Sequence, residues 1–153
     1  MPMDARLDTM DLALEEARIA AARGEVPVGA VVSDAAGTIW AARGNEVERL
    51  DNPTAHAEFL ALSQAAAARG TRYLADCTLT VTLEPCALCA GAIAAYRIKK
   101  LIFAAYDPKS GAIDHGPRLF THQTTHHKPE IVGGVREGEA SSLLKAFFAG
   151  LRD

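Results

Sequence analysis

The chain has 153 residues, of which 49% are hydrophobic and 23% charged, and its formal net charge is −3. This balance is typical of a globular protein, and the length favours a single domain over residues 1–153 that buries a core without disulfides. Three cysteines, an odd number, argue against a disulfide framework, and the slightly acidic total gives no sign of a general affinity for nucleic acid.

The first 24 residues predict an amphipathic helix. Leu7, Met10, Leu14 and Ala17 recur on one stripe, and Gly24 is a typical helix stop. Acidic residues interrupt the apolar pattern, so the segment lacks the basic start and continuous apolar core of a signal peptide. No later stretch is apolar over the length that crosses a bilayer. We therefore expect a cytoplasmic protein with no membrane partner.

Strands and helices alternate along the remainder of the chain. Residues 26–34 and 38–45 flank a turn and predict a hairpin. One helix is expected after a cap at Thr54, and another begins with Pro85 at its first position. The other predicted elements are strands at 77–83, 100–107 and 129–135 and a last helix with the apolar stripe Ala140, Leu143, Leu144, Phe147 and Leu151. This order predicts the α/β class, with a mixed sheet covered by helices on both faces.

Two of the predicted helix starts carry residues with the chemistry of metal ligands. Cys86 and Cys89 are three residues apart in the first turn of one helix, which places both sulfurs on one face. His56 lies in the first turn of the other helix, and two thiolates with one imidazole suit zinc. Three protein ligands are typical of a catalytic zinc site, which keeps a position for water. Cys77, on the apolar face of its strand, is more typical of a small buried hydrophobe.

Glu58 indicates where such a metal would lie. Residues two apart do not share a helix face, so His56 and Glu58 reach one centre only if it lies off the end of the helix. We therefore expect the metal at the N-termini of two helices, whose macrodipoles favour thiolates and a zinc-bound hydroxide. Glu58 is then the acceptor for the proton of the zinc-bound water.

The motifs H-x-E at residues 56–58 and P-C-x-x-C at residues 85–89 resemble those of the cytidine/deoxycytidylate deaminase superfamily. Further segments are similar to the bacterial tRNA-specific adenosine deaminases within it, and together they cover nearly the whole chain. These segments are Glu25–Val32, Asn45, Pro53–Glu58, Thr82–Ile93, Arg97–Ile98, Asp107–Ala112 and Leu143–Arg152.

The resemblance implies a three-layer cytidine-deaminase-like fold with a five-stranded sheet, and a homodimer with one Zn²⁺ per subunit. It implies conversion of adenosine to inosine at the wobble position of a tRNA anticodon stem-loop. His56, Cys86 and Cys89 would hold zinc, and zinc-bound hydroxide would attack C6 of the base. Glu58 would take a proton from the zinc-bound water and deliver it to N1, and it would then protonate the leaving ammonia. The implied substrate contacts are Val28, Asn45, the backbone of Ala57, Asp107, Lys109 and Arg152.

Some positions depart from the family pattern. Leu88 stands where Met is usual, a nearly volume-conserving change, and Ala104 replaces a common Gly. The segment 113–130 differs from the commonest form of that loop, so tRNA specificity is the property most affected by the departures.

Two other functions fit parts of the pattern. A deaminase of a free base, nucleoside or nucleotide, of guanine or cytosine type, would use the same zinc chemistry in a more closed pocket, and the net acidity favours it. A non-catalytic zinc-stabilised interaction domain would need a fourth ligand, from His115, His122, His126 or His127, and would not depend on Glu58. Binding of RNA would instead need a local basic patch, from Arg97, Lys99, Lys100, Lys109, Arg118, Lys128 and Arg152.

Overall fold

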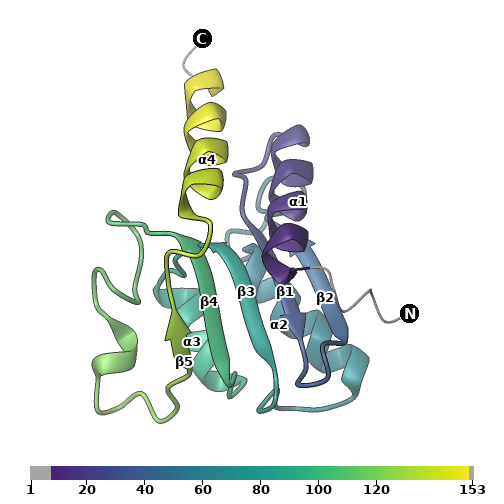
Figure 1. The fold of residues 1–153 in the computed structure, drawn as a ribbon, viewed down its shortest axis with the longest axis vertical. Helices are drawn as coiled ribbons and strands as arrows, with labels where there is room; N and C mark the ends of the chain where they lie inside the picture. The colour runs from purple at the N-terminus through teal and green to yellow at the C-terminus, as the bar shows by residue number, and fades with distance from the viewer. Residues whose placement is uncertain (1–7, 152–153) are drawn as a thin grey trace.

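The structure is a computed structural model that describes residues 8–151. Leu7, from the first predicted stripe, and Arg152, from the expected RNA contacts, therefore lie outside the described residues. Within the described part, a five-stranded sheet lies between two pairs of helices (Figure 1). None of these helices is both long and apolar enough to cross a lipid bilayer.

The sheet has the strand order β2-β1-β3-β4-β5. Strand β1 (Gly29–Ser33) pairs antiparallel with β2 (Ile39–Gly44) and with β3 (Thr78–Leu83). Strands β4 (Lys100–Ala105) and β5 (Glu130–Val132) continue the sheet in parallel from β3. The predicted mixed five-stranded sheet is therefore confirmed.

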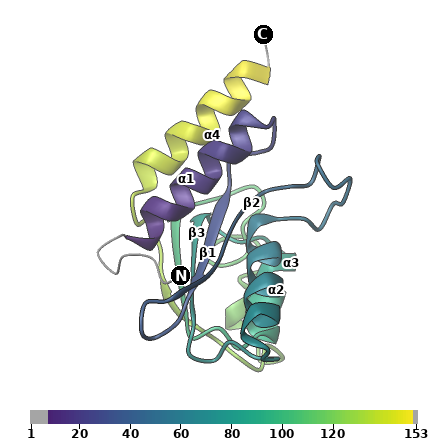
Figure 2. The same ribbon diagram turned by 90° about the vertical axis from the view of Figure 1, so that its right-hand side faces the viewer.

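Two helices cover each face of the sheet (Figure 2). Helices α2 (Ala57–Arg69) and α3 (Ala87–Ala95) lie on one face, and α1 (Thr9–Ala22) and α4 (Glu137–Leu151) lie on the other. A short 3₁₀ helix, η1 (Leu119–Thr121), follows in the long loop between β4 and β5. The predicted three-layer arrangement is confirmed.

Helix α1 shows why the sequence forms a helix that packs on a sheet. The Asp8 carboxylate accepts a hydrogen bond from the Met10 N–H at 3.0 Å and caps the first turn. The helix ends before Gly24, whose φ of 84° is the left-handed conformation expected at the predicted stop. Its buried residues recur every three or four positions and face the sheet; they are Met10, Ala13, Leu14, Ala17 and Ala20.

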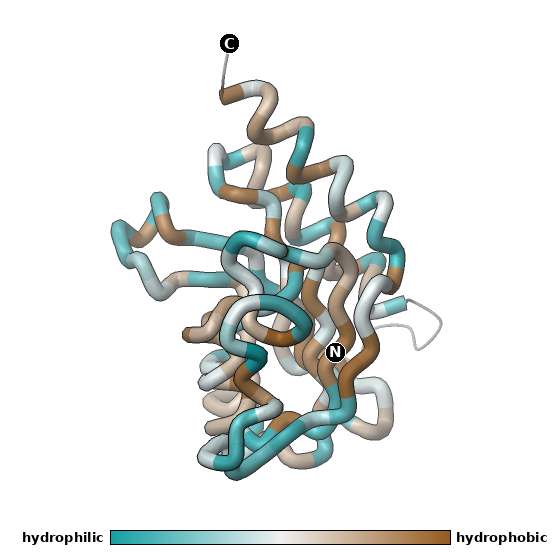
Figure 3. Tube along the Cα trace, turned by 90° about the vertical axis from the view of Figure 1, so that its left-hand side faces the viewer, coloured by the Kyte–Doolittle hydropathy of each residue, from teal (hydrophilic) through white to brown (hydrophobic). Residues whose placement is uncertain are grey.

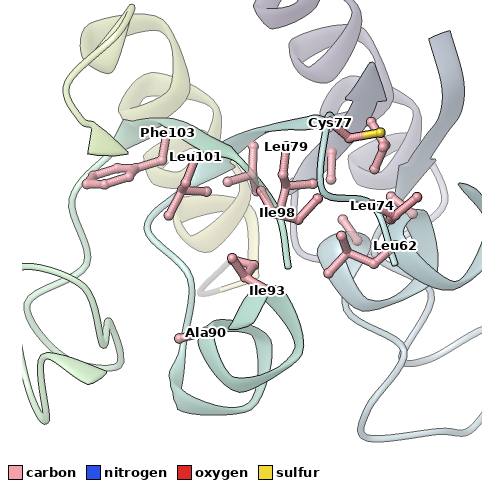
Figure 4. Close-up of a cluster of buried hydrophobic side chains, with 14 of the residues drawn as sticks. Leu62, Leu74, Cys77, Leu79, Ala90, Ile93, Ile98, Leu101 and Phe103 are labelled. Carbon is pink, nitrogen blue, oxygen red and sulfur yellow. The ribbon is translucent and has the colours of Figure 1, made fainter. Parts of the chain in front are cut away.

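The larger hydrophobic core lies between the sheet and helices α2 and α3 (Figure 4). Leu62 from α2 and Ile93 from α3 contribute to the same cluster as Leu79 and Leu101 from the strands. Cys77 is fully buried in this cluster, as predicted for a small hydrophobe. The core anchors both helices that carry the motif residues.

The opposite face of β3 is also covered. Its threonines alternate with the apolar residues, yet Thr80 and Thr82 are buried because α1 packs over them. The Thr80 hydroxyl lies 3.0 Å from the Thr9 hydroxyl, and the Thr82 hydroxyl accepts a hydrogen bond from the Gly29 N–H at 3.1 Å. Polar partners on the neighbouring element thus allow threonine on a face that does not reach solvent.

Hydropathy along the chain follows the division between the sheet and its loops. Apolar segments run along the strands, and polar segments form the loops around them (Figure 3). Helix α4 differs from its prediction, because only Ala140 of the expected stripe is buried. Leu151 is 68% exposed, since the far end of α4 extends past the sheet that covers its first turns (Figure 1). The predicted last helix is therefore confirmed, but the end of its apolar stripe is exposed.

Both motif helices begin later than predicted. Thr54 does not cap α2, because its hydroxyl donates to the Asn52 side chain at 2.8 Å; His56 is the cap residue instead. Pro85 lies outside α3, because its carbonyl accepts a hydrogen bond from the Ala112 N–H at 2.8 Å, and Cys86 is the cap residue. The two helix starts are therefore occupied by the predicted metal ligands.

Candidate active site

Four chain segments bring three predicted site residues, together with Glu84, to one edge of the sheet. Val28 precedes β1 and Asn45 follows β2, and the register pairs the start of β1 with the end of β2. Glu84 follows β3, and Asp107 lies shortly after β4, whose end neighbours that of β3. Because β1 runs antiparallel to β3, all four positions lie at the same edge.

Three potential ligand atoms meet beside this edge. His56 Nδ1 lies 3.5 Å from Cys86 Sγ and 3.5 Å from Cys89 Sγ, and all three atoms lie within 4.8 Å of one another. His56 and Cys86 are the cap residues of α2 and α3, and both have extended backbone, whereas Cys89 lies in the first turn of α3. The core between the helices and the sheet holds the two helix starts together.

This group fits a zinc ion. Zinc bonds of about 2.0–2.1 Å to nitrogen and about 2.3 Å to sulfur, at a tetrahedral angle, place the two atoms about 3.5 Å apart. The distances from His56 to both sulfurs match that separation. Neither helix has a side-chain capping hydrogen bond, and the positive ends of the two helix dipoles lie at the group and favour thiolates.

The pKa values of the Cys86 and Cys89 thiols are shifted in opposite directions. Hydrogen bonds from Cys89 and from His56 lower the pKa of Cys86 to about 4, against the effect of burial. The hydrogen bond to Cys86, together with burial, raises the pKa of Cys89. Contact with Cys86 raises the pKa of His56. A thiolate with an adjacent thiol and imidazole is an arrangement that a cation can complete by displacing protons.

Glu58 lies next to this group without belonging to it. It is in the first turn of α2, is 5% exposed, and contacts Cys89 through its side chain. Burial is the main reason why the pKa of its carboxyl is raised. A buried carboxyl group that is not a metal ligand suits proton transfer beside the metal.

The histidines after β4 do not complete the group. His115 lies against a buried carboxylate, and His122 and His127 lie against main-chain carbonyl oxygens. Among residues 8–151, the cluster of possible metal ligands contains only His56, Cys86 and Cys89. The geometry therefore argues against a closed structural site with four protein ligands.

A cavity of about 190 Å³ opens onto the ligand group. This is smaller than the roughly 300–1,000 Å³ of pockets for drug-sized ligands, so the cavity suits one small ring system. Most of the predicted substrate contacts lie in its wall, which is formed by Val26, Val28, Asn45, His56, Ala57, Glu58, Leu83, Glu84, Cys86, Asp107 and Ser110.

Lys109 lies outside this cavity. It lines a second space of about 560 Å³ that shares Val26, Leu83, Asp107 and Ser110 with the inner cavity. The outer wall of this groove is formed by α4, through Leu144, Phe148 and Leu151. The structure thus separates a small inner cavity from a larger outer groove.

Asn45 has two roles in the structure. Its main-chain N–H donates to the Val28 carbonyl at 3.1 Å, and its side-chain oxygen accepts from the Val47 N–H at 3.1 Å. These bonds fix it as a turn residue while its side chain lines the cavity. The buried Glu25 carboxylate holds the same loop by accepting from the Glu48 and Arg49 N–H groups.

Sequence reasoning missed four residues of the cavity wall: Val26, Leu83, Glu84 and Ser110. Leu83 is the last residue of β3 and Glu84 follows it, so their place at a strand end was the available signal for these two. Glu84 is the most unusual, since its carboxylate is buried and accepts hydrogen bonds from the segment 107–115. Burial by itself would raise its pKa, but these donors, starting with the Asp107 N–H, hold the pKa below its usual value.

Comparison with known proteins identifies the family. Residues 3–105 match the family model described as the cytidine and deoxycytidylate deaminase zinc-binding region. The chain belongs to the cytidine and deoxycytidylate deaminase family. This deaminase is 45% identical over 147 residues to the tRNA-specific adenosine deaminase of Agrobacterium fabrum, which covers 95% of each chain.

Solved structures agree with this result. The deaminase superimposes with a TM-score of 0.87 and 44% identity on a protein studied for A-to-I editing by tRNA:A34 deaminases at the wobble position of transfer RNA. That match covers 89% of this chain and 98% of the other. The guanine deaminase of Nitrosomonas europaea gives a TM-score of 0.79 and 29% identity, over 92% of this chain and 83% of the other. This chain is therefore an enzyme of the zinc-dependent deaminase class.

Proposed function

We propose that this deaminase converts adenosine to inosine by hydrolysis at the wobble position of a tRNA anticodon stem-loop. His56, Cys86 and Cys89 hold one Zn²⁺ per subunit. The observation that carries the proposal is the meeting of these three ligand atoms beside a small cavity lined by Glu58 and Asn45. The similarity to tRNA-specific adenosine deaminases over nearly all of the chain supports the choice of substrate.

In the proposed mechanism the metal activates water and Glu58 transfers protons. When bound, zinc supplies a water activated for attack on an aromatic carbon near neutral pH. Glu58 would take a proton from that water and pass it to N1 of the base, and would then move the proton of the new C6 hydroxyl to the amino group, which leaves as ammonia. Its position in the first turn of α2, in the cavity wall and outside the ligand group, allows it to exchange protons without binding the metal.

The cavity wall orients the base. Asn45 hydrogen-bonds the purine, the backbone at Ala57 contacts it, and Val28 packs against the ring. Asn45 is held in place by its hydrogen bonds to Val28 and Val47, so its position is set before the substrate arrives. An apolar, largely buried Val28 beside a fixed amide favours a flat base that stacks on one side and hydrogen-bonds on another.

The outer groove favours RNA over a free base. A free base needs only the inner cavity, whereas the nucleotides that flank a flipped-out adenosine need adjoining space. The groove beside α4 offers that space, and Asp107 and Lys109 in its wall are proposed to contact the RNA. Arg152, outside the described residues, is kept as a proposed RNA contact from the resemblance. A guanine deaminase is the second candidate, because a guanine deaminase shares the fold at 29% identity.

We further propose that the enzyme is a cytoplasmic homodimer. Helix α3 contains no charged residue, yet it presents the exposed Ala87, Leu88 and Ala95 away from the core. Leu88 is 41% exposed, in a helix that is apolar throughout. A second copy of the chain would bury this face.

A single assay tests the proposed substrate. The enzyme is incubated with a tRNA that carries adenosine at the wobble position, and inosine is detected by sequencing as a change from A to G. A matched tRNA with the same adenosine moved into the stem is the control. Free guanine, cytosine and adenosine are tested in parallel by ammonia release. We expect inosine at the wobble position only; release of ammonia from guanine without change in the tRNA would show that the second candidate is right.

A further inference from the structure

The buried carboxylate of Glu84 has no part in the mechanism described above. It lies directly before Pro85 and Cys86, and its side chain is completely shielded from solvent. A buried carboxylate normally has a partner of opposite charge or a set of hydrogen-bond donors. Here most of the donors are main-chain N–H groups, and all of them come from one segment of the chain, residues 107–115.

The two carboxylate oxygens bind opposite ends of this segment. Oε1 accepts from the Asp107 N–H at 3.0 Å and lies 2.8 Å from His115 Nδ1. Oε2 accepts from the N–H groups of Ile113, Asp114 and His115 at 3.1, 2.9 and 3.2 Å. The Glu84 carboxylate therefore joins the two ends of residues 107–115, and the segment forms a loop around this side chain.

Glycine at position 111 allows this arrangement. A Cβ atom at Gly111 would lie 2.5 Å from the Glu84 carboxyl carbon and 2.6 Å from Oε2. The loop can thus approach the carboxylate only without a side chain at this position. The next residue, Ala112, donates its N–H to the Pro85 carbonyl at 2.8 Å, so the loop is bound to the start of α3 as well.

The loop carries part of the substrate wall. Asp107 and Ser110 line the inner cavity, and Lys109 lines the outer groove. The Asp107 carboxylate accepts from the N–H groups of Lys109 and Ser110, so the position of Asp107 sets that of its neighbours. The ligand atoms and Glu58 lie on α2 and α3 and receive no hydrogen bond from this loop among the described residues.

We propose that Glu84 is a positioning residue, whose carboxylate fixes the loop 107–115 against the start of α3 and so places the substrate wall opposite the metal ligands. Its effect on turnover rests on the proposed function, whereas its effect on the loop does not. Loss of the carboxylate should loosen the binding of substrate while the ligand group and the proton carrier stay in place.

Glu84→Gln tests this with almost no change in shape. The amide has one acceptor oxygen, so in either orientation its NH₂ group faces N–H donors, either at Asp107 or at residues 113–115. We expect amide hydrogen exchange in residues 107–115 to quicken at least tenfold. KM for the tRNA substrate should rise at least tenfold, kcat should change less than threefold, and zinc content should equal that of the parent enzyme.

Two further variants test whether these effects come from the contact between Glu84 and the loop. Gly111→Ala disturbs the same contact from the loop side and should reproduce the rise in exchange and in KM. Asp34→Asn is the matched control: this carboxylate accepts from the Ala36 and Thr38 N–H groups and the Trp40 indole in the β1–β2 turn, away from the cavity. It should quicken exchange only in that turn and leave KM and kcat unchanged.

The outcomes separate the possible roles of Glu84. Unchanged exchange in residues 107–115, or loss of zinc from Glu84→Gln, would overturn the proposal. So would a fall in kcat at unchanged KM. The exchange and zinc measurements need no substrate, so they remain decisive if the tRNA activity itself is absent, and that absence would count against the proposed function alone.

Discussion

His56 and Glu58 are two residues apart, and their helix positions separate metal binding from proton transfer. His56 is the cap residue of α2, with extended backbone, and its imidazole meets the two sulfurs at the start of α3. Glu58 is already inside the helix, buried and in the cavity wall. A side chain that is not a ligand keeps its carboxyl group available to accept and release protons.

Replacement of Glu58 by alanine should stop turnover and leave the metal bound. General acid–base catalysis typically contributes about 10²–10⁴-fold, so single-turnover formation of inosine should fall at least that far. Zinc measured by mass spectrometry should remain at the parent level. Cys86→Ala is the contrasting variant, because it removes a ligand and should lose both zinc and stability. A zinc-free Glu58→Ala protein, or one that retains activity, would contradict the assigned role.

At the scale of the elements, the site depends on close contact between the sheet and the helices that cover it. Strand β1 packs against α1 on one face, and Val28, directly before the strand, lines the cavity. At Gly29 the strand and the helix touch through main-chain atoms, since an added Cβ would overlap the Ala13 carbonyl oxygen and lie 2.8 Å from the Ala17 nitrogen. Backbone atoms cannot move aside as a flexible side chain can.

Gly29→Ala should therefore destabilise the protein strongly. Overpacking in a close-packed core costs typically about 1–3 kcal/mol and more where only backbone can shift, so we expect a loss of at least about 3 kcal/mol. The free energy of unfolding is measured by urea denaturation of the zinc-loaded protein. Gly138→Ala is the control: it lies in α4 with no atom near the added Cβ and should be neutral or stabilising by up to about 1 kcal/mol. Equal stability of the two variants would show that α1 does not pack so tightly on β1.

Much of this architecture could be predicted from local patterns. Period-two and helical spacing gave the order of all nine main elements, and the ligand spacing gave the meeting of His56 with the cysteines. The predictions failed where the structure depends on contacts that local sequence patterns do not contain. Thr54 looked like a cap but is engaged by Asn52, and the apolar stripe ending at Leu151 carries no information on where the sheet ends. Glu84 was missed because its donors lie about thirty residues further along the chain.

At the scale of the whole molecule, the two faces of the sheet differ in what their helices leave exposed. On one face, charged side chains link α1 and α4: Arg18 of α1 pairs with Glu139 of α4, and Arg136, directly before α4, pairs with Asp11 of α1. On the other, α3 is uncharged, and Leu88 is exposed on it between the two cysteine ligands. An uncharged helix that bears a metal site and faces solvent is a costly arrangement for a monomer, and a second copy would resolve it.

Leu88→Gln should convert the proposed dimer to a monomer. In a two-fold symmetric interface each change occurs twice, and burial of an unpaired amide costs roughly 1–3 kcal/mol, so the pair should weaken association by about 30-fold or more. Glutamine adds no charge beside the metal ligands, so zinc content should not change. Sedimentation equilibrium gives the dissociation constant. Ile19→Gln on α1 is the matched control, since Ile19 and Leu88 are aliphatic residues exposed to 40% and 41%, and it should leave the mass unchanged. A parent protein that sediments as a monomer, or equal effects of the two variants, would place α3 outside any interface between copies.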